Sequence, residues 1–232
     1  MTATIEDNIA GIRRSMAEAA LRSGRDASAV RLMAVTKTVD ERRVGEAIAA
    51  GVDMIGENYV QEAQRKIEAI GERIAWHMIG HLQTNKAKYA VKLFDMVHSV
   101  DSIALARELD RRSRDAGRIM GILIEVNSGG EATKSGASPE KVLPLIREAA
   151  LLKNIAIRGL MTMPPWFDDP EKARPYFATL RELRDRIVGE RIEDVRMEEL
   201  SMGMSSDYRV AIEEGATIVR VGRGIFGERP CC

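Results

Sequence analysis

A lysine stands at the end of an apolar run near the start of the chain. Residues 32–35, Leu-Met-Ala-Val, lead through Thr36 into Lys37. A short apolar run rich in β-forming residues predicts a buried strand. A lysine at its end either extends its ammonium group to water or supplies an amine that can attack a carbonyl compound. The strand alone favours the first interpretation.

A glycine-rich segment follows the last predicted strand. Residues 217–221 run directly into residues 222–227, Gly-Arg-Gly-Ile-Phe-Gly, which match the pattern G-x-G-x-x-G. A dinucleotide-binding fold needs a further helix, a strand and an acidic residue about 20 positions on, which the sequence up to Cys232 does not provide. Glycines also let backbone N–H groups approach a phosphate, and barrels often bind phosphate after strands seven and eight. The segment therefore predicts a phosphate site, to which Ser201 on the preceding strand could add a hydroxyl donor.

An amine and a phosphate site together describe a phosphorylated carbonyl compound held as a Schiff base. Two kinds of protein fit this description. One is a class I aldolase that acts on a sugar phosphate, and the other is a barrel that holds pyridoxal 5′-phosphate (PLP) on Lys37. A lysine on the first strand, with the phosphate site at the other end of the chain, favours the PLP barrel.

The composition excludes several other classes of protein. The 232 residues include 35 basic and 35 acidic ones without a basic run, so nothing supports a nucleic-acid partner. The first 20 residues carry five charged side chains, which excludes a secretory signal, and no later apolar run could span a membrane. The two cysteines, Cys231 and Cys232, are adjacent, so we expect a reducing cytoplasm. No His, Cys, Asp and Glu cluster has metal-ligand spacing, and we expect no metal.

Strand and helix patterns alternate along the chain. The expected strands cover residues 31–37, 53–56, 74–80, 96–100, 119–127, 155–163, 199–202 and 216–221. An amphipathic helix opens the chain from residue 5 to about 23, and further helices are expected at about 40–51, 60–70, 84–93, 101–117, 139–152, 171–188 and 207–214, with Asp40 and Asp101 as N-caps. No helix is expected after the last strand.

This alternation predicts a parallel sheet, and eight units in a chain of this length fit a closed (β/α)8 barrel of the TIM type. An open doubly wound sheet is the alternative. No Pro/Gly/Ser-rich linker interrupts the chain, so we expect a single α/β domain over residues 1–232. Within it, residues 1–30 form the extra N-terminal helix and lead-in, 31–227 the barrel, and 228–232 a tail.

Polar residues stand at the ends of the expected strands. Barrel enzymes build their sites from the C-terminal ends of the strands. The residues at these ends are Thr36, Lys37, Glu57, Asn58, His77, His98, Ser99, Asn127, Thr162, Ser201, Arg220 and Gly222, with His81 just beyond. Any one of them could be a structural residue, but so many at one rim predict a functional site.

Several segments together resemble one protein family. They are residues 35–38, 55–62, 76–86, 134–136, 159–161, 200–205, 219–222 and 225–227. In order and over nearly the whole chain, they are similar to the PLP homeostasis protein family, whose barrel resembles the N-terminal domain of alanine racemase. The resemblance implies that Lys37 carries PLP, and that Ser201 and the backbone at Gly222 and Arg223 bind its phosphate.

One residue departs from the family pattern. The family usually has threonine where this chain has Arg223. The backbone donor is kept and the hydroxyl is lost. The guanidinium could contact the phosphate or face solvent, and a loop arginine between two glycines favours solvent.

The resemblance also assigns the ring surroundings. It implies that Arg220 approaches the pyridine nitrogen, that Asn58 and His77 lie around the ring, and that Lys134 lies near the substrate side. His77 is equally well explained as a core histidine. For His98 and Lys134 a structural or solvent-facing position is favoured.

The function that the resemblance implies is intracellular homeostasis of PLP and amino acids, by cofactor handling rather than turnover. PLP-dependent apo-enzymes are candidate recipients, and we expect a monomer. The competing interpretation is a PLP-dependent amino-acid racemase, and a Schiff-base lyase of the aldolase kind is the weaker third. In the racemases that this barrel resembles, a second domain supplies an opposing tyrosine, and the residues after Gly227 offer no such domain.

Overall fold

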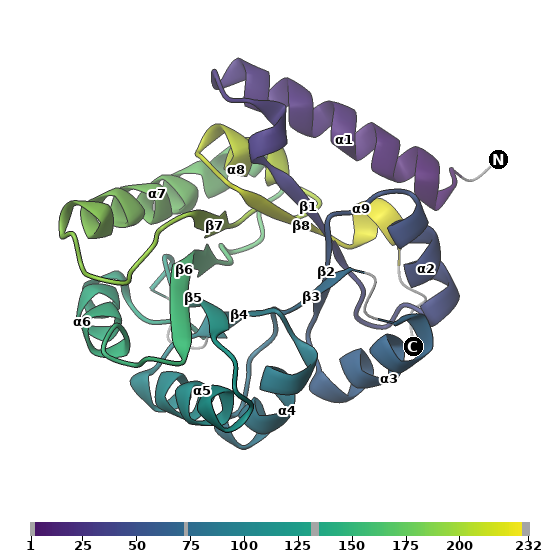
Figure 1. Ribbon diagram of the computed structural model, residues 1–232. Helices are drawn as coiled ribbons and strands as arrows, with labels where there is room; N and C mark the ends of the chain where they lie inside the picture. Colours follow the sequence, from purple (N-terminus) through teal and green to yellow (C-terminus); the bar gives the residue numbers. More distant parts are fainter. Residues whose placement is uncertain (1–2, 72–73, 131–134, 229–232) are drawn as a thin grey trace.

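The segments expected to be strands form one closed barrel of eight parallel strands in the computed structural model, which describes residues 3–71, 74–130 and 135–228. The strands are β1 (Arg31–Val35), β2 (Met54–Glu57), β3 (Ala75–Met78), β4 (Met96–Val100), β5 (Met120–Val126), β6 (Ile155–Thr162), β7 (Glu199–Ser201) and β8 (Ile218–Val221). They pair in sequence order, and β8 closes the ring against β1 (Figure 1). The predicted TIM-type architecture is confirmed, and the open sheet is wrong.

Helices surround the barrel in the order that the sequence predicts. They are α1 (Ile5–Arg22), α2 (Glu41–Ala49), α3 (Val60–Ile70), α4 (Ala87–Leu93), α5 (Ile103–Asp115), α6 (Pro139–Ala149), α7 (Arg174–Gly189), α8 (Tyr208–Glu213) and α9 (Arg223–Phe226), with short 3-10 turns η1 (Ala27–Ala29), η2 (Thr84–Lys86) and η3 (Pro170–Ala173). None of these helices in the described part of the chain is long and apolar enough to cross a membrane.

Two expectations about the helices were wrong. A short helix, α9, does follow the last strand, because Ile225 and Phe226 turn into the core in spite of the flanking glycines. Asp101 does not cap α5; the cap is Ser102, whose Oγ accepts from the Leu105 amide at 3.5 Å. Asp40 does cap α2, with its Oδ1 3.0 Å from the Arg43 amide.

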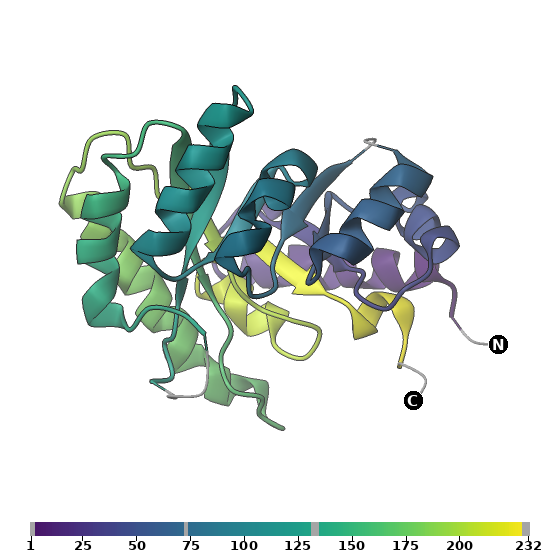
Figure 2. The ribbon, with the colours of Figure 1, turned by 90° about the horizontal axis from the view of Figure 1, so that it is seen from below.

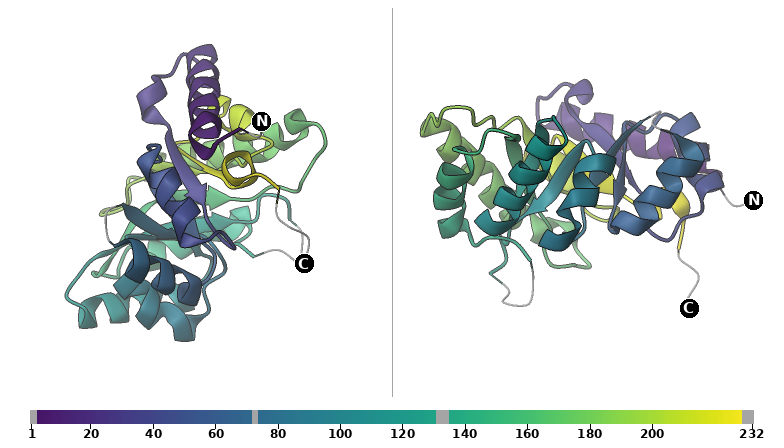
Figure 3. Two further views of the ribbon diagram at one scale, coloured as in Figure 1. Left: turned by 90° about the vertical axis from the view of Figure 1, so that its right-hand side faces the viewer. Right: turned by 60° about the horizontal axis from the view of Figure 1, so that its bottom comes forward.

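The N-terminal helix completes the outer layer. α1 contacts α8, α9 and α2, and Figure 3 shows it outside the ring beside α8. Its buried stripe includes Ile9, Ile12 and Met16. α9 has only four residues, which is too short to cover the seam between β8 and β1. The extra helix predicted at residues 5–23 therefore covers this seam.

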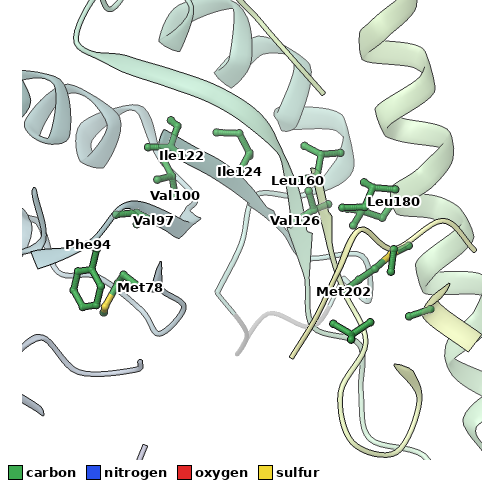
Figure 4. Close-up of a cluster of buried hydrophobic side chains, with 14 of the residues drawn as sticks. Met78, Phe94, Val97, Val100, Ile122, Ile124, Val126, Leu160, Leu180 and Met202 are labelled. Atoms are coloured by element: carbon green, nitrogen blue, oxygen red, sulfur yellow. The ribbon is translucent and has the colours of Figure 1, made fainter. Parts of the chain in front are cut away.

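Apolar residues form two separate clusters because successive strand side chains point to opposite faces. The larger cluster lies between strands and helices, and Figure 4 shows part of it, with Leu160 of β6 near Leu180 of α7. The smaller one joins Met33, Met54 and Ile218 across three neighbouring strands, inside the barrel. These three residues fix which side of each strand faces inward.

The C-terminal ends of the strands share one rim, on the lower side of Figure 2 with α9 and the C-terminus. The residues expected to form the site follow the strands at this rim. Alternation then divides them: those an even number of positions from an inward residue face the barrel interior, and the others face the helices.

Candidate functional site

The polar residues at the rim belong to two networks on opposite sides of the barrel wall. Arg220 shares its face of β8 with the inward residue Ile218, so it points into the barrel. Glu57 lies three positions after the inward Met54, so it points outward to the helices. The expectation that all these strand ends direct polar groups to one place was therefore wrong for Glu57.

Arg220 is the centre of the inward network. The residue is only 4% exposed, and its guanidinium donates from Nη1 to Ser201 O (2.6 Å) and Ser201 Oγ (2.8 Å) and from Nη2 to Thr162 O (2.9 Å). Burial lowers the pKa of Arg220 to about 10, although Asp207 and Glu125 act against this shift. The side chain therefore stays protonated at neutral pH and is held by two neighbouring strands.

A line of side chains runs from Arg220 across the barrel interior. Ser201 Oγ lies 3.0 Å from His98 Nδ1, and His98 Nε2 lies 2.9 Å from His77 Nδ1. Arginine can only donate, so Ser201 accepts from Arg220 and has its own proton to give to His98 Nδ1. With the Ser201 proton given to His98 Nδ1, His98 carries its own proton on Nε2 and donates to His77. We assign both neutral tautomers on this basis.

Both histidines are neutral in this environment. Burial lowers the pKa of His77 to about 4, and burial together with the nearby His77 and Arg220 lowers the pKa of His98 well below its usual range. Glu125, on the inward face of β5, shows the opposite shift: burial and then Asp101 raise its pKa to about 7, against the effect of Arg220. The interior thus disfavours further charge of either sign.

We expect acid to destabilise the protein through the histidines. Between pH 6.5 and 4 the unfolded chain binds a proton at His77 and the folded chain does not, so the free energy of unfolding falls by up to about 3 kcal/mol as the pH drops. Glu125 contributes in the opposite sense: the folded chain binds its proton first, and stability is lost as the pH rises from 4.5 to about 7.

Urea unfolding at a series of pH values measures this balance. Glu125→Gln should steepen the loss of stability on acidification, because it removes the opposing titration, and His77→Gln should flatten it. Parallel pH profiles for wild type and both variants would contradict the assignment of these pKa shifts.

The outward network includes Thr36, the residue before Lys37. Lys37 and Thr38 form a tight turn in which the Val39 amide donates to Thr36 O at 3.0 Å. Thr36 Oγ1 donates to Glu57 Oε1 at 2.5 Å, and both side chains are buried. Lys37 itself is half-buried and lies two positions after the end of β1.

The glycine loop after β8 lies beside the end of β1. A Cβ added to Gly222 would lie 3.3 Å from Val35 O, so any larger residue there would push the two strand ends apart by a few tenths of an ångström. The Gly224 amide donates to Ser205 Oγ at 3.2 Å. The preceding amides begin α9 and have no intrahelical acceptor. This part of the rim can therefore receive an anion.

The structure separates Ser201 from this loop. Ser201 pairs with Ile218, four positions before Gly222, and its hydroxyl lies in the line between Arg220 and His98. Ser205 lies level with the loop, as its bond to Gly224 shows. A serine two residues after Gly203 was visible in the sequence. Whether Ser201 or Ser205 reaches the glycine loop, however, depends on how β7 and β8 align. Arg223 is exposed.

Asn58 is half-buried and directly follows β2. A Cβ on Gly80 would lie 2.7 Å from Asn58 Cα, so the loop after β3 packs tightly on the Asn58 backbone. Ser99 Oγ donates to Gly80 O at 2.6 Å and thereby holds that loop instead of facing the site. Lys134 lies outside the described residues.

Other polar strand ends have structural partners. Thr162 Oγ1 donates to Val126 O and lies 2.8 Å from Ser128 Oγ. His81 is exposed and lines a cavity of about 490 Å³ between residues 81–85 and the start of α5. The lining of this cavity includes none of the residues predicted to bind the cofactor. Within the described ranges, no three His, Cys, Asp or Glu side chains gather so that they could hold a metal ion.

Sequence reasoning missed three charged residues of the two networks. Glu125 is the one charged residue of the otherwise apolar strand β5, next to its C-terminal end, which was a visible signal. Lys66 and Glu62 lie on α3, where Lys66 occupies the buried face three residues after Ala63. A lysine at an apolar position of an amphipathic helix could have been recognised as buried.

Comparison with known proteins gives consistent matches. The family described as alanine racemase, N-terminal domain, matches residues 4–230. A curated relative from Aquifex aeolicus, named pyridoxal phosphate homeostasis protein, is 43% identical over 224 residues, covering 96% of this chain and 97% of the relative.

Solved structures agree with this result. A protein described as unknown, from Bifidobacterium adolescentis, is 39% identical with a TM-score of 0.92, covering 96% of this chain and 94% of that one. PipY from Synechococcus elongatus PCC7942, solved with PLP bound, is 36% identical with a TM-score of 0.83, covering 97% of this chain and all of PipY (100%).

Proposed function

This chain belongs to the pyridoxal phosphate homeostasis protein family, within the alanine racemase N-terminal domain family, and from that premise we propose that it holds PLP on Lys37 and serves the homeostasis of PLP and amino acids. The relative solved as PipY has PLP bound. The next question is therefore whether the residues at the rim of this chain could bind PLP.

The observation that carries the proposal is the placement of Lys37 and the glycine loop on neighbouring strands. β1 pairs with β8, Lys37 follows the first and Gly222 follows the second. An amine and an anion-binding loop thus lie side by side at one rim. A phosphorylated aldehyde needs this pair of groups, because its two ends are recognised by different chemistry.

The remaining residues fit the same cofactor. The backbone of Gly222 and Arg223 and the Ser205 hydroxyl are proposed to bind the phosphate, with the Arg223 side chain in solvent. We keep Ser201 in the site in a different role, as the residue that orients Arg220, since its hydroxyl is already engaged there. When bound, PLP supplies an aldehyde that condenses with an amine to form a C=N bond and release water.

Arg220, Asn58 and His77 are proposed to surround the ring. Arg220 can only donate and stays charged at neutral pH, so a ring nitrogen that faces it must accept and remain unprotonated. His77, the last residue of the line that begins at Arg220, would contact the pyridine ring. Asn58 would lie at the edge of the same ring.

We propose that cofactor handling, rather than turnover, is the role of this site. An unprotonated pyridine nitrogen withdraws electrons weakly, which suits storage and transfer of PLP better than carbanion chemistry. The family name of the relatives supports the same conclusion. PLP-dependent apo-enzymes would be the recipients, and PLP the only small molecule that the site must hold.

Borohydride trapping tests the attachment. The protein is incubated with PLP, reduced, digested and mapped by mass spectrometry. We expect one pyridoxyl label, on the peptide that contains Lys37, and none in the Lys37→Ala control. A label on Lys86 or Lys134 with none on Lys37 would refute the proposal.

A further inference from the structure

A lysine on α3 is completely buried beneath the turn that carries Lys37. Lys66 is 0% exposed, and its Nζ donates to Thr36 O at 2.5 Å, to Glu57 Oε1 at 2.7 Å and to Glu62 Oε1 at 2.7 Å. An ammonium has three protons, and all three are used here. Burial raises the pKa of Glu57, against the effect of its bonds from Lys66 and Thr36.

The turn above this lysine has an unfavourable backbone conformation. Thr38 has a φ of 64°, which is rare for a β-branched residue. Such a conformation costs on the order of 1–3 kcal/mol and persists only where the surroundings impose it. Here the Thr38 amide donates to Glu62 Oε1 at 2.6 Å, on the same oxygen that accepts from Lys66.

Both neighbours of Lys37 are therefore attached to one helix. Thr36 is held through its carbonyl by Lys66 and through its hydroxyl by Glu57, and Thr38 is held through its amide by Glu62. Lys37 lies between these two anchored residues. We propose that Lys66, with Glu57 and Glu62, is a positioning residue that keeps the turn strained so that the Lys37 amine is presented to PLP.

A purely structural role explains these contacts less well. A buried ion pair seldom stabilises a fold more than an apolar residue of similar size, because desolvating the charges offsets their attraction. Stability alone would favour an apolar residue at the Lys66 position, on the buried face of α3. All three acceptors of the ammonium instead lead to the two residues that flank Lys37. This inference rests on the proposed function, since it concerns how Lys37 is presented.

The experiment compares how fast PLP is captured on Lys37 with how stable the protein is. Single-site capture is followed by absorbance and by borohydride trapping on the Lys37 peptide, and stability by urea unfolding. Lys66→Met should slow capture on the order of a hundredfold, because a displacement of about 1 Å has effects of this size on reactions between positioned groups. Thr38→Gly, which accepts a positive φ without strain, should restore most of that rate in the Lys66→Met background.

Two matched controls separate positioning from general destabilisation. Arg65→Met removes the neighbouring cation of α3, whose exposed side chain pairs with Glu41 and does not touch the turn. Leu109→Ala creates a cavity in the buried face of α5, away from β1. Both should keep the wild-type capture rate, including Leu109→Ala at a comparable loss of unfolding free energy.

Several results would overturn the proposed positioning role of Lys66. Unchanged capture in Lys66→Met, or a slowing that Leu109→Ala reproduces, would overturn the inference, and so would a failure of Thr38→Gly to restore the rate. If Lys66→Met does not fold, Glu62→Ala decides instead: it releases the Thr38 amide and one of the three acceptors of Lys66, leaves the bonds of Lys66 to Thr36 O and Glu57 Oε1 in place, and must slow capture at least tenfold. Absence of a label on Lys37 in the wild type would refute the proposed function, which keeps the two failures distinct.

Discussion

Lys37→Ala is expected to abolish covalent capture of PLP and to leave a weaker, reversible association through the glycine loop. In the proposed site the Lys37 amine is the protein's part of the covalent link, whereas the proposed phosphate contacts come from the backbone after β8 and from Ser205. If the covalent bond contributes about 3 kcal/mol, the apparent Kd should rise on the order of a hundredfold.

Equilibrium dialysis and absorbance titration measure this change. Lys37→Arg is the matched control: it keeps the positive charge at the rim, but a guanidinium stays protonated and does not condense with an aldehyde. Both variants should lose the absorbance of the covalent adduct. Wild-type affinity in Lys37→Ala would mean that the link is elsewhere, while full affinity in Lys37→Arg alone would reduce the role of Lys37 to its charge.

Arg220→Glu is expected to have the second large effect, on stability and on the bound cofactor together. The substitution removes the three donated bonds to Ser201 and Thr162, and it places a carboxylate near Glu125 and Asp207, whose pKa values burial already raises. Breaking a buried charged cluster of this kind costs about 3–5 kcal/mol. In protein that stays folded, a carboxyl facing the pyridine nitrogen should protonate it and shift the absorbance of bound PLP.

Arg220→Lys separates these two effects. It keeps the charge but cannot reach both Ser201 and Thr162 with a planar fork, so it should lose stability without protonating the ring. Urea unfolding and absorbance spectra of the PLP-loaded proteins report the two effects separately. An unchanged spectrum in Arg220→Glu at full PLP occupancy would show that this side chain does not face the ring nitrogen.

The barrel itself could be predicted because its signals are local. Apolar strands alternate with amphipathic helices, and every strand and every helix except α9 was predicted close to its observed bounds. α9 was missed because two glycines and an arginine at its start conceal the contribution of Ile225 and Phe226. A four-residue helix is set by its packing rather than by its own propensities.

The directions of the side chains at the strand ends were harder to predict, because a shift of one residue moves a side chain from the barrel interior to the helix-facing side. His77 and Glu57 both stand near the ends of their strands, yet one lies in the inward line and the other against Lys66. The choice between Ser201 and Ser205 depends on the alignment of β7 with β8, which is a non-local property. Residue types at strand ends thus predict that a site exists, but they do not predict which atoms meet.

The line of side chains from Arg220 to His77 also limits which substitutions these positions can tolerate. Arg220 at one end can only donate, and in the tautomers assigned above Ser201 and His98 each accept on one side and donate on the other. A replacement at Ser201 or His98 that cannot do both leaves two like groups facing each other in a buried place. Mutations along the line should therefore be strongly epistatic, so that these four positions change together or stay fixed while the surface of the barrel diverges around them.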